Sequence, residues 1–301
     1  MRAEIDPEVV LALAQARPVV ALESTLICHG LPRPRNLELA RAVEAAVRAE
    51  GAVPATVAVM DGQVRVGLDD ASLVRLAAAE GVAKCSPRDL PLVLAQRRLG
   101  ATTVAGTIRV AAAVGIRVMA TGGIGGVHRG GEASLDVSAD LFELARSGVA
   151  VVCSGAKIIL DLPRTLEALE SLGVPVVGFG TGDFPAFYAR ASGLAVPRVD
   201  DLAGLVALLR AQAALGWPSG LVIANPPPEA HALPSAELEA WIAAALAEAR
   251  GRGIAGAAET PALLAALAER SGGRTVAVNE ALVLDNARLA ARLAALACGE
   301  G

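Results

Sequence analysis

Short apolar segments alternate with longer helical patterns along the whole chain, and this alternation is what most restricts its fold. The segments that predict strands are residues 18–23, 52–60, 116–120, 149–153, 175–179 and 220–224. The patterns that predict helices include residues 36–50, 235–250, 261–270 and 280–297. Strands that alternate with helices form β-α-β units, and strands that are apolar throughout are covered on both faces. The sequence therefore predicts a three-layer α/β/α fold with a largely parallel central sheet.

The chain shows no division into separate domains and no pattern typical of export. No linker, repeat of fixed period or shift in composition interrupts it, so we expect residues 1–301 to form one domain. Acidic residues precede the first short apolar stretch, which is not typical of a signal peptide. The uncharged residues 211–228 are broken by glycine and proline and do not predict a membrane span. We therefore expect no membrane partner. The four cysteines lack paired spacing, and free thiols suit a reducing compartment, so we expect a cytoplasmic protein.

Composition argues against a nucleic-acid partner. The formal net charge is −4, no cluster of basic residues stands out, and only 2% of the residues are aromatic. Proteins that bind polyanions present basic patches, and those that bind single strands stack bases on aromatic rings. We therefore expect a small-molecule ligand.

Lysine is almost absent from this chain. Of 27 Lys and Arg residues, only Lys84 and Lys157 are lysines. Arginine stays protonated, whereas a desolvated lysine can act as a neutral amine nucleophile. The count alone does not separate a catalytic amine from a surface lysine. Lys157, however, follows the apolar residues 149–156, and ligands of parallel sheets bind beyond the carboxyl ends of the strands.

Glu23 ends the first apolar segment, residues 18–23. A carboxyl group at such a position tends to lose solvent, which raises its pKa and suits it to general-acid catalysis. The alternative is an acid that caps a backbone amide or pairs with Arg33 or Arg35. On local pattern alone, this alternative is favoured.

A glycine-rich segment follows the strand at residues 116–120. It holds six glycines between Gly122 and Gly131, together with His128 and Arg129. This density exceeds what packing alone is expected to need, so we interpret the segment as an anion site in which Arg129 adds a charged fork. A flexible surface turn is the alternative. The segment matches neither the dinucleotide nor the Walker fingerprint.

Three further polar residues stand near predicted helix starts. Asp136 and Asp140 are four residues apart, so they would share one helix face and could hold a divalent cation if both lay in a first turn. Plain capping of the helix is favoured by the local pattern. Asn279 precedes the last predicted helix and reads as its N-cap, where phosphate binding is possible but capping without a ligand is commoner.

Several motifs occur together in one known family. They are ALEST at 21–25, GAVPAT at 51–56, RDLP at 88–91, GATTV at 100–104, TGGIGGVHRG at 121–130, SAD at 138–140 and ANPPPE at 224–229. On these motifs the chain resembles the pseudouridine-5′-phosphate glycosidases over about residues 18–295. It departs from the usual family pattern at Cys85 and Pro87 beside Lys84, and at Pro163 and Arg164 after Asp161.

The resemblance implies reversible cleavage of pseudouridine 5′-phosphate to uracil and ribose 5-phosphate by a homotrimer that binds one Mn²⁺ per subunit. It assigns Lys157 as nucleophile, Glu23 as proton donor and Asp136 as metal ligand. The residues that it places against the substrate are Lys84, Val104, Ser138, Ala139, Asp140 and Asn279. The departures at Cys85 and Pro87 bear on the setting of Lys84.

A carbon-linked leaving group explains why this reaction would need an amine. Attack of neutral Lys157 on C1′, with Glu23 protonating the ring oxygen, would open the ribose, and the lysine nitrogen would then expel uracil as an imine forms. Asp140, His128 or water would supply the proton to uracil C5. The same lysine and anion site would also serve a Schiff-base aldolase acting on another sugar phosphate, and a non-catalytic sugar-phosphate sensor would bind without turnover.

Overall fold

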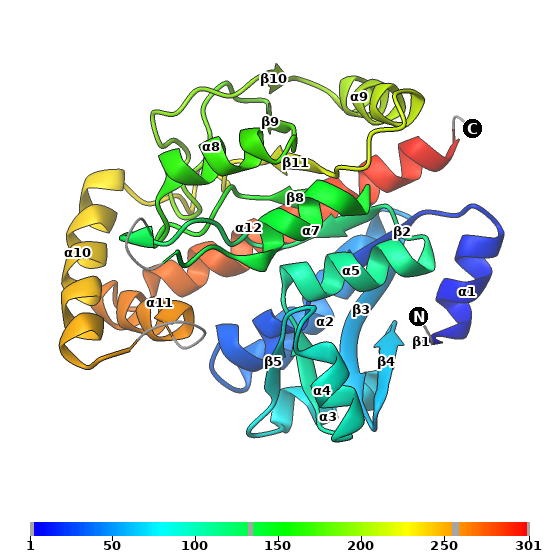
Figure 1. Cartoon of the computed structure of the whole chain (residues 1–301), viewed down its shortest axis with the longest axis horizontal. Coiled ribbons are helices and arrows are strands. Elements are labelled where there is room, and N and C mark those ends of the chain that lie inside the picture. The colour runs from blue at the N-terminus through cyan, green and yellow to red at the C-terminus, as the bar shows by residue number, and fades with distance from the viewer. Residues whose placement is uncertain (1–2, 132–134, 255–258, 300–301) are drawn as a thin grey trace.

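A mostly parallel sheet forms the centre of the molecule (Figure 1). The computed structural model describes residues 3–131, 135–254 and 259–299. Within these residues the strands are β1 (Ala3–Ile5), β2 (Val19–Leu22), β3 (Val53–Met60), β4 (Gln63–Val66), β5 (Ala83–Cys85), β6 (Gly100–Thr102), β7 (Val118–Ala120), β8 (Ala150–Cys153), β9 (Val176–Phe179), β10 (Arg198–Val199) and β11 (Leu221–Ala224). The main path runs β1-β4-β3-β2-β7-β8-β11-β9-β10, and β6 joins β5 to β3.

Helices cover both faces of this sheet (Figure 1). They are α1 (Pro7–Ala14), α2 (Arg35–Ala49), α3 (Asp70–Ala78), α4 (Leu90–Ala95), α5 (Val104–Val114), α7 (Ala139–Ser147), α8 (Leu162–Ser171), α9 (Leu202–Ala214), α10 (Ser235–Gly251), α11 (Glu259–Arg270) and α12 (Arg274–Gly299), with a π-helical turn η1 (Leu26–Gly30). The long α12 packs against α2, α9 and the central strands, whereas α5 packs against α7 in front of the sheet (Figure 1). The predicted three-layer α/β/α fold is confirmed.

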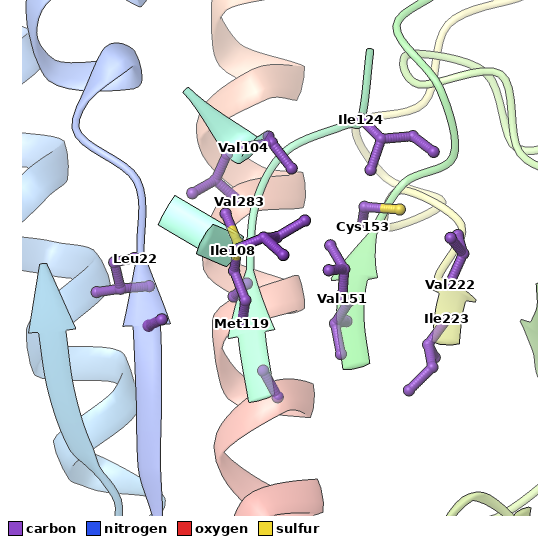
Figure 2. Close-up of a cluster of buried hydrophobic side chains, with 14 of the residues drawn as sticks. Leu22, Val104, Ile108, Met119, Ile124, Val151, Cys153, Val222, Ile223 and Val283 are labelled. Carbon is purple, nitrogen blue, oxygen red and sulfur yellow. The ribbon is translucent and has the colours of Figure 1, made fainter. Parts of the chain in front are cut away.

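The central strands are buried on both faces. All residues of β2, β3, β8 and β11 are buried, and most of them are valine, alanine or leucine. Figure 2 shows this core, to which β7 contributes Met119, α5 contributes Ile108 and α12 contributes Val283. In the parallel register Leu22 pairs with Ala120, and Ala120 with Val152, so these three strands end at the same level. The residues that follow them therefore meet at one edge.

The sheet is not wholly parallel. Strand β3 pairs antiparallel with β4 and with β6, while the other pairings between named strands are parallel. The β3–β4 hairpin turns at Asp61 and Gly62, both with positive φ, which is the backbone that Asp-Gly hairpins adopt. Through β6 this part of the sheet also holds β5, where Lys84 pairs with Ala101.

The last helix begins earlier than the sequence pattern indicated. Helix α12 starts at Arg274, directly after Gly272 and Gly273, so the prediction that Asn279 caps it is wrong. The apolar residues 276–278 resemble an extended segment locally, but Val278 is buried on a helical face against the core. Across the described ranges, no helix is long and apolar enough to cross a bilayer. The single-domain organisation of residues 1–301 stays a prediction.

Candidate active site

A cavity of about 500 Å³ opens beyond the carboxyl ends of β2, β7 and β8. Every residue to which the family resemblance gave a role in catalysis, substrate binding or metal binding lies on its wall, together with His128. These residues are Glu23, Lys84, Val104, His128, Asp136, Ser138, Ala139, Asp140, Lys157 and Asn279. Residues from widely separated parts of the chain thus converge on one space, as expected for strand ends and helix starts of a parallel sheet.

Glu23 follows β2 and faces the cavity. Burial raises the pKa of its carboxyl group above the ordinary value, against the opposing charge of Lys157 and a hydrogen bond from Thr121. The Thr121 hydroxyl donates that bond to Oε1 at 2.5 Å. A carboxyl whose pKa is raised holds its proton to higher pH, as a general acid requires.

The alternative ion pairs proposed for Glu23 do not form. Arg33 donates to the carbonyls of Ala77 and Ala79 instead, at 3.1 and 2.7 Å. Arg35 pairs with Glu280 of α12. The interpretation that Glu23 pairs with one of these arginines is therefore wrong.

Lys157 is held by an extension of the β7–β8 pairing. Beyond the strands, Ser154 N donates to Gly122 O at 2.8 Å, and Ile124 N donates to Gly155 O at 3.1 Å. Lys157 N then donates to Ile124 O at 3.0 Å. This ladder sets a partly buried lysine on the cavity wall, where its charge acts on both Glu23 and Lys84.

Lys84 reaches the same cavity from β5. Burial lowers the pKa of its ammonium group, and the charge of Lys157 lowers it further, against Asp140 and Glu23. The unusual neighbour Cys85 is fully buried in the core, and Pro87 lines the cavity. The two departures from the family pattern therefore leave Lys84 on the cavity wall.

Two helices begin at this wall. Thr103 caps α5, whose first residue is Val104, and Ser138 caps α7, whose first residue is Ala139. Asp140 joins the two starts. It is buried, and its carboxylate accepts from Ala105 N at 2.8 Å and from Gly125 N at 2.7 Å.

Asp136 and Asp140 do not share a helix face, so the condition for a cation site made by these two residues is not met. Helix α7 begins at Ala139, so Asp136 precedes it, while the Asp140 carboxylate turns toward α5 and the glycine-rich segment. Ser138 is the residue that caps the helix, since its hydroxyl accepts from Asp140 N. Asp136 remains a candidate metal ligand only if residues other than Asp140 complete the site.

The glycines of residues 122–131 are there largely for packing. A methyl group at Gly123 would meet the Phe187 ring at 2.7 Å, and one at Gly125 or Gly126 would collide with Ser138 or Thr165. The expectation that six glycines exceed the needs of packing is therefore wrong. Close approach to neighbouring side chains, invisible in the sequence, accounts for most of them.

Arg129 does not form the charged fork that we expected. Its guanidinium pairs with Glu239 of α10 at 3.1 Å and donates to the carbonyls of Ile158 and Leu160. It lies outside the set of residues that line the cavity. The partner of the guanidinium is thus a carboxylate from α10, a helix far away in the chain.

His128, Asp136 and Glu259 form a candidate metal group. Their ligand atoms lie within 4.8 Å of one another, and His128 Nδ1 is 3.0 Å from Glu259 and 3.9 Å from Asp136. One imidazole and two carboxylates can hold a divalent cation. Sequence reasoning missed Glu259, because an acid in the first turn of α11 is ordinarily explained by the helix dipole.

Asn279 lies inside α12 rather than at its start. The residue is only 6% exposed, and its Oδ1 atom has no hydrogen-bond partner among the described residues. Gly122 lies against it. Since buried polar atoms are nearly always paired, an orphaned amide oxygen at a cavity wall fits contact with a ligand.

Phe187 is a cavity residue that the sequence did not reveal. It adopts φ +61°, packs its ring against Gly123, and donates its backbone N–H to Ser154 O at 2.9 Å. A left-handed backbone is strained for a residue with a large side chain. No local pattern marks this position, which depends on a loop beyond β9.

The chain is similar to known proteins along nearly its whole length. The family model described as Indigoidine synthase A like protein matches residues 8–296. The chain belongs to this family. Among curated members, a protein of Paracoccus denitrificans is 57% identical and one of Methylobacterium nodulans 56%, each over 97% of this chain and over 97% and 87% of their own lengths. Both are named pseudouridine-5′-phosphate glycosidase.

Two solved structures share the fold of this chain. The prealnumycin C-glycosynthase AlnA, solved with ribulose 5-phosphate, is 43% identical, with a TM-score of 0.92 over 99% of this chain and 97% of its own. An indigoidine synthase A-like protein of Thermotoga maritima is 35% identical, with a TM-score of 0.90 over 98% of this chain and 96% of its own. The family fold therefore extends over nearly the whole chain.

Proposed function

We propose that this protein reversibly cleaves the C-glycosidic bond of pseudouridine 5′-phosphate to give uracil and ribose 5-phosphate. The observation that carries the proposal is the meeting of Lys157 with Glu23, whose pKa is raised, in one cavity. Relatives at 56% and 57% identity that bear the name of this activity support it.

The first chemical step opens the sugar. The Lys157 nitrogen attacks C1′, the bond from C1′ to the ring oxygen breaks, and Glu23 gives its proton to that oxygen. The hydrogen bond from Thr121 keeps the Glu23 carboxyl oriented during this transfer. An arginine at position 157 would remain a cation and would offer no lone pair.

The second step releases the base. After the attack the nitrogen carries a positive charge, and it loses a proton to water, which restores its lone pair. That lone pair then forms a protonated imine with C1′ while the bond from C1′ to uracil C5 breaks, and the electron pair left on C5 takes up a proton. Water then hydrolyses the imine, which returns the free amine and ribose 5-phosphate. A carbon leaving group departs this way because the imine nitrogen accepts the positive charge that would otherwise develop on the sugar.

The phosphate would bind where α5 and α7 begin. Helix N-termini attract anions through their free amides and dipoles, here at Val104 and Ala139. The Asp140 carboxylate ties both helices to the glycine-rich segment and so fixes their spacing. Lys84, Ser138 and Asn279 would complete the contacts to the sugar phosphate.

A divalent cation fits the group made by His128, Asp136 and Glu259. We assign it as Mn²⁺ on the family resemblance, held by Asp136 together with the two partners that the structure brings beside it. When bound, it supplies positive charge at the cavity wall. We also propose a homotrimer in the cytoplasm, with no nucleic-acid or membrane partner.

The decisive experiment runs the reaction in the direction of synthesis. Incubation with uracil, ribose 5-phosphate and Mn²⁺ should yield a C-glycoside, seen by its ultraviolet spectrum and mass, and borohydride should trap ribose phosphate on Lys157, mapped by peptide mass. Trapping without a C-glycoside would favour a Schiff-base aldolase. Binding of ribose 5-phosphate with neither product would favour a sensor.

A further inference from the structure

We infer that Asn286 is a positioning residue that holds the segments behind Glu23 and Lys157 in register, and that Asn225 sets the direction of its amide. The inference rests on the proposed function, because it concerns the two residues assigned to the chemistry. Asn225 belongs to the ANPPPE motif, which the cavity lining does not include.

One buried amide bridges the ends of two strands. Asn286 lies on α12 and is fully buried. Its Nδ2 donates to the backbone oxygen of Thr121 at 2.9 Å and to the Ser154 hydroxyl at 3.1 Å. Thr121 follows β7 and Ser154 follows β8, so the amide joins the first residues beyond both strands.

Each bridged residue is connected to one of the two residues assigned to the reaction, Thr121 to Glu23 and Ser154 to Lys157. The Thr121 hydroxyl donates to Glu23, so a shift of Thr121 would move the bond that orients the proton donor. Ser154 begins the ladder that ends at Lys157 N. Asn286 therefore fixes the distance between amine and acid without contacting the cavity itself.

The direction of the Asn286 amide is determined by its partners. A backbone carbonyl only accepts, so the nitrogen must face Thr121 and the oxygen must face Asn225, whose Nδ2 donates to it at 3.0 Å. Asn225 Nδ2 also donates to the Asp285 carboxylate at 2.8 Å, which likewise accepts. The hydrogen-bond partners therefore fix which end of each amide, in Asn225 and in Asn286, carries the nitrogen.

Helix α12 presents this amide from the same face as two other inward residues. Asn279, Val283 and Asn286 are spaced by four and three residues and so share a helix face. Figure 2 shows Val283 directed at the core beside β7, while Asn279 lines the cavity. The helix is therefore anchored by packing at Val283, and this leaves Asn286 little freedom to move.

The test is the isosteric variant Asn286→Asp, which keeps the shape of the side chain and removes both N–H donors. Misplacement of reacting groups lowers kcat about 10- to 100-fold, whereas binding of ribose 5-phosphate should change less than about threefold, because the phosphate contacts lie on α5 and α7. Asn225→Ala should lower kcat less. The double variant should be no worse than Asn286→Asp, since the two amides act in series.

Asn36→Asp is the matched control. Asn36 is also buried, and its Nδ2 also donates twice, to Ile27 O at 2.9 Å and Ala77 O at 3.0 Å, away from Thr121 and Ser154. Equal losses of kcat in both variants, or an unchanged kcat in Asn286→Asp and Asn225→Ala, would overturn the inference. If Asn286→Asp does not fold, Asn225→Ala decides it alone.

Hydrogen exchange separates this inference from the proposed function. Backbone amides of residues 121–126 and 154–160 should exchange faster in the Asn286 and Asn225 variants and unchanged in the Asn36 variant, whatever the reaction is. Unchanged exchange in those peptides would refute the positioning role. If instead the wild-type protein makes no C-glycoside and traps no sugar, the proposed function fails while the exchange result still stands.

Discussion

The two walls of the cavity are built in different ways. The strand-end wall, defined by Glu23, Thr121 and Lys157, consists of residues that follow β2, β7 and β8. The metal wall, defined by His128 and Asp136 on the cavity and by Glu259 beside them, brings together the glycine-rich segment, the stretch before α7 and the start of α11.

The difference lies in what holds each wall in place. Backbone hydrogen bonds continue the β7–β8 pairing as far as Lys157 N, so a polar residue on the strand-end wall has a place set by the sheet itself. Glu259 meets His128 only because α11 packs across the cavity. The strand-end wall can thus hold the residues of a covalent reaction in fixed positions, whereas the geometry of the metal wall depends on a distant helix.

The largest effect is expected at Lys157. Lys157→Arg keeps the positive charge but removes the amine, so the rate should fall at least about 1,000-fold, as for loss of other covalent nucleophiles. Binding of ribose 5-phosphate, measured by calorimetry, should persist. Ordinary turnover by this variant would refute the nucleophile assignment.

Glu23→Gln should come next. It removes the proton donor but keeps the hydrogen bond from Thr121 possible, and general-acid catalysis is worth about 100- to 10,000-fold. Borohydride trapping at Lys157 should slow along with turnover. A variant that traps sugar at the wild-type rate would show that ring opening does not need this acid.

The pH dependence of the wild-type enzyme should carry the signature of Glu23. Burial raises the pKa of its carboxyl, so Glu23 should keep its proton at pH values above the ordinary pKa of glutamate. The reaction rate should therefore stay high there and fall as the pH rises through the raised pKa. The same group stabilises the fold below the unfolded pKa, and this stability is lost as pH rises through the folded pKa. Both trends, followed by kinetics and thermal unfolding, should be absent in Glu23→Gln.

The metal wall should respond to changes on α11. Glu259→Gln and His128→Ala should each weaken Mn²⁺ binding by about 10- to 100-fold, measured by electron paramagnetic resonance of the free ion. Borohydride trapping of ribose 5-phosphate should be less affected than metal binding. Unchanged Mn²⁺ affinity in Glu259→Gln would confine the metal site to the two remaining residues.

The smallest effect is expected at Arg129. Its side chain is tied to Glu239 and to two carbonyls outside the cavity, so Arg129→Gln should change the affinity for ribose 5-phosphate less than about twofold. The exposed ion pair contributes only about 0–1 kcal/mol to stability. A large loss of affinity, measured by calorimetry, would revive the interpretation of Arg129 as an anion contact.

The positions of Glu23 and Lys157 could be predicted because the apolar pattern that marks each strand is local in the sequence. Each follows a short apolar strand, and parallel strands end at a common edge whatever else the chain does. The scarcity of lysine added a chemical reason to single out Lys157. The resemblance to a family then supplied roles that no pattern in the residues could assign.

One error concerned a helix boundary, and the others arose where a distant element decided the outcome. Asn279 lies within α12 because that helix extends back to Arg274, and Arg129 turns outward because α10 offers Glu239. The glycines leave room for the side chains of Phe187, Ser138 and Thr165, which pack against them from other segments. Such contacts join residues separated by tens of positions, and local patterns contain no record of them.

The sequence by itself determined the layered sheet and the strand ends at which chemistry is possible, because hydrophobic periodicity and strand direction are local properties. Only the tertiary structure decided which polar groups face one another. It brought Glu259 to His128, turned Asp140 toward Ala105, and set Asn286 across two strand ends. The physical reason is that a hydrogen bond or ion pair requires atoms within a few ångströms, and packing of distant helices alone sets that distance.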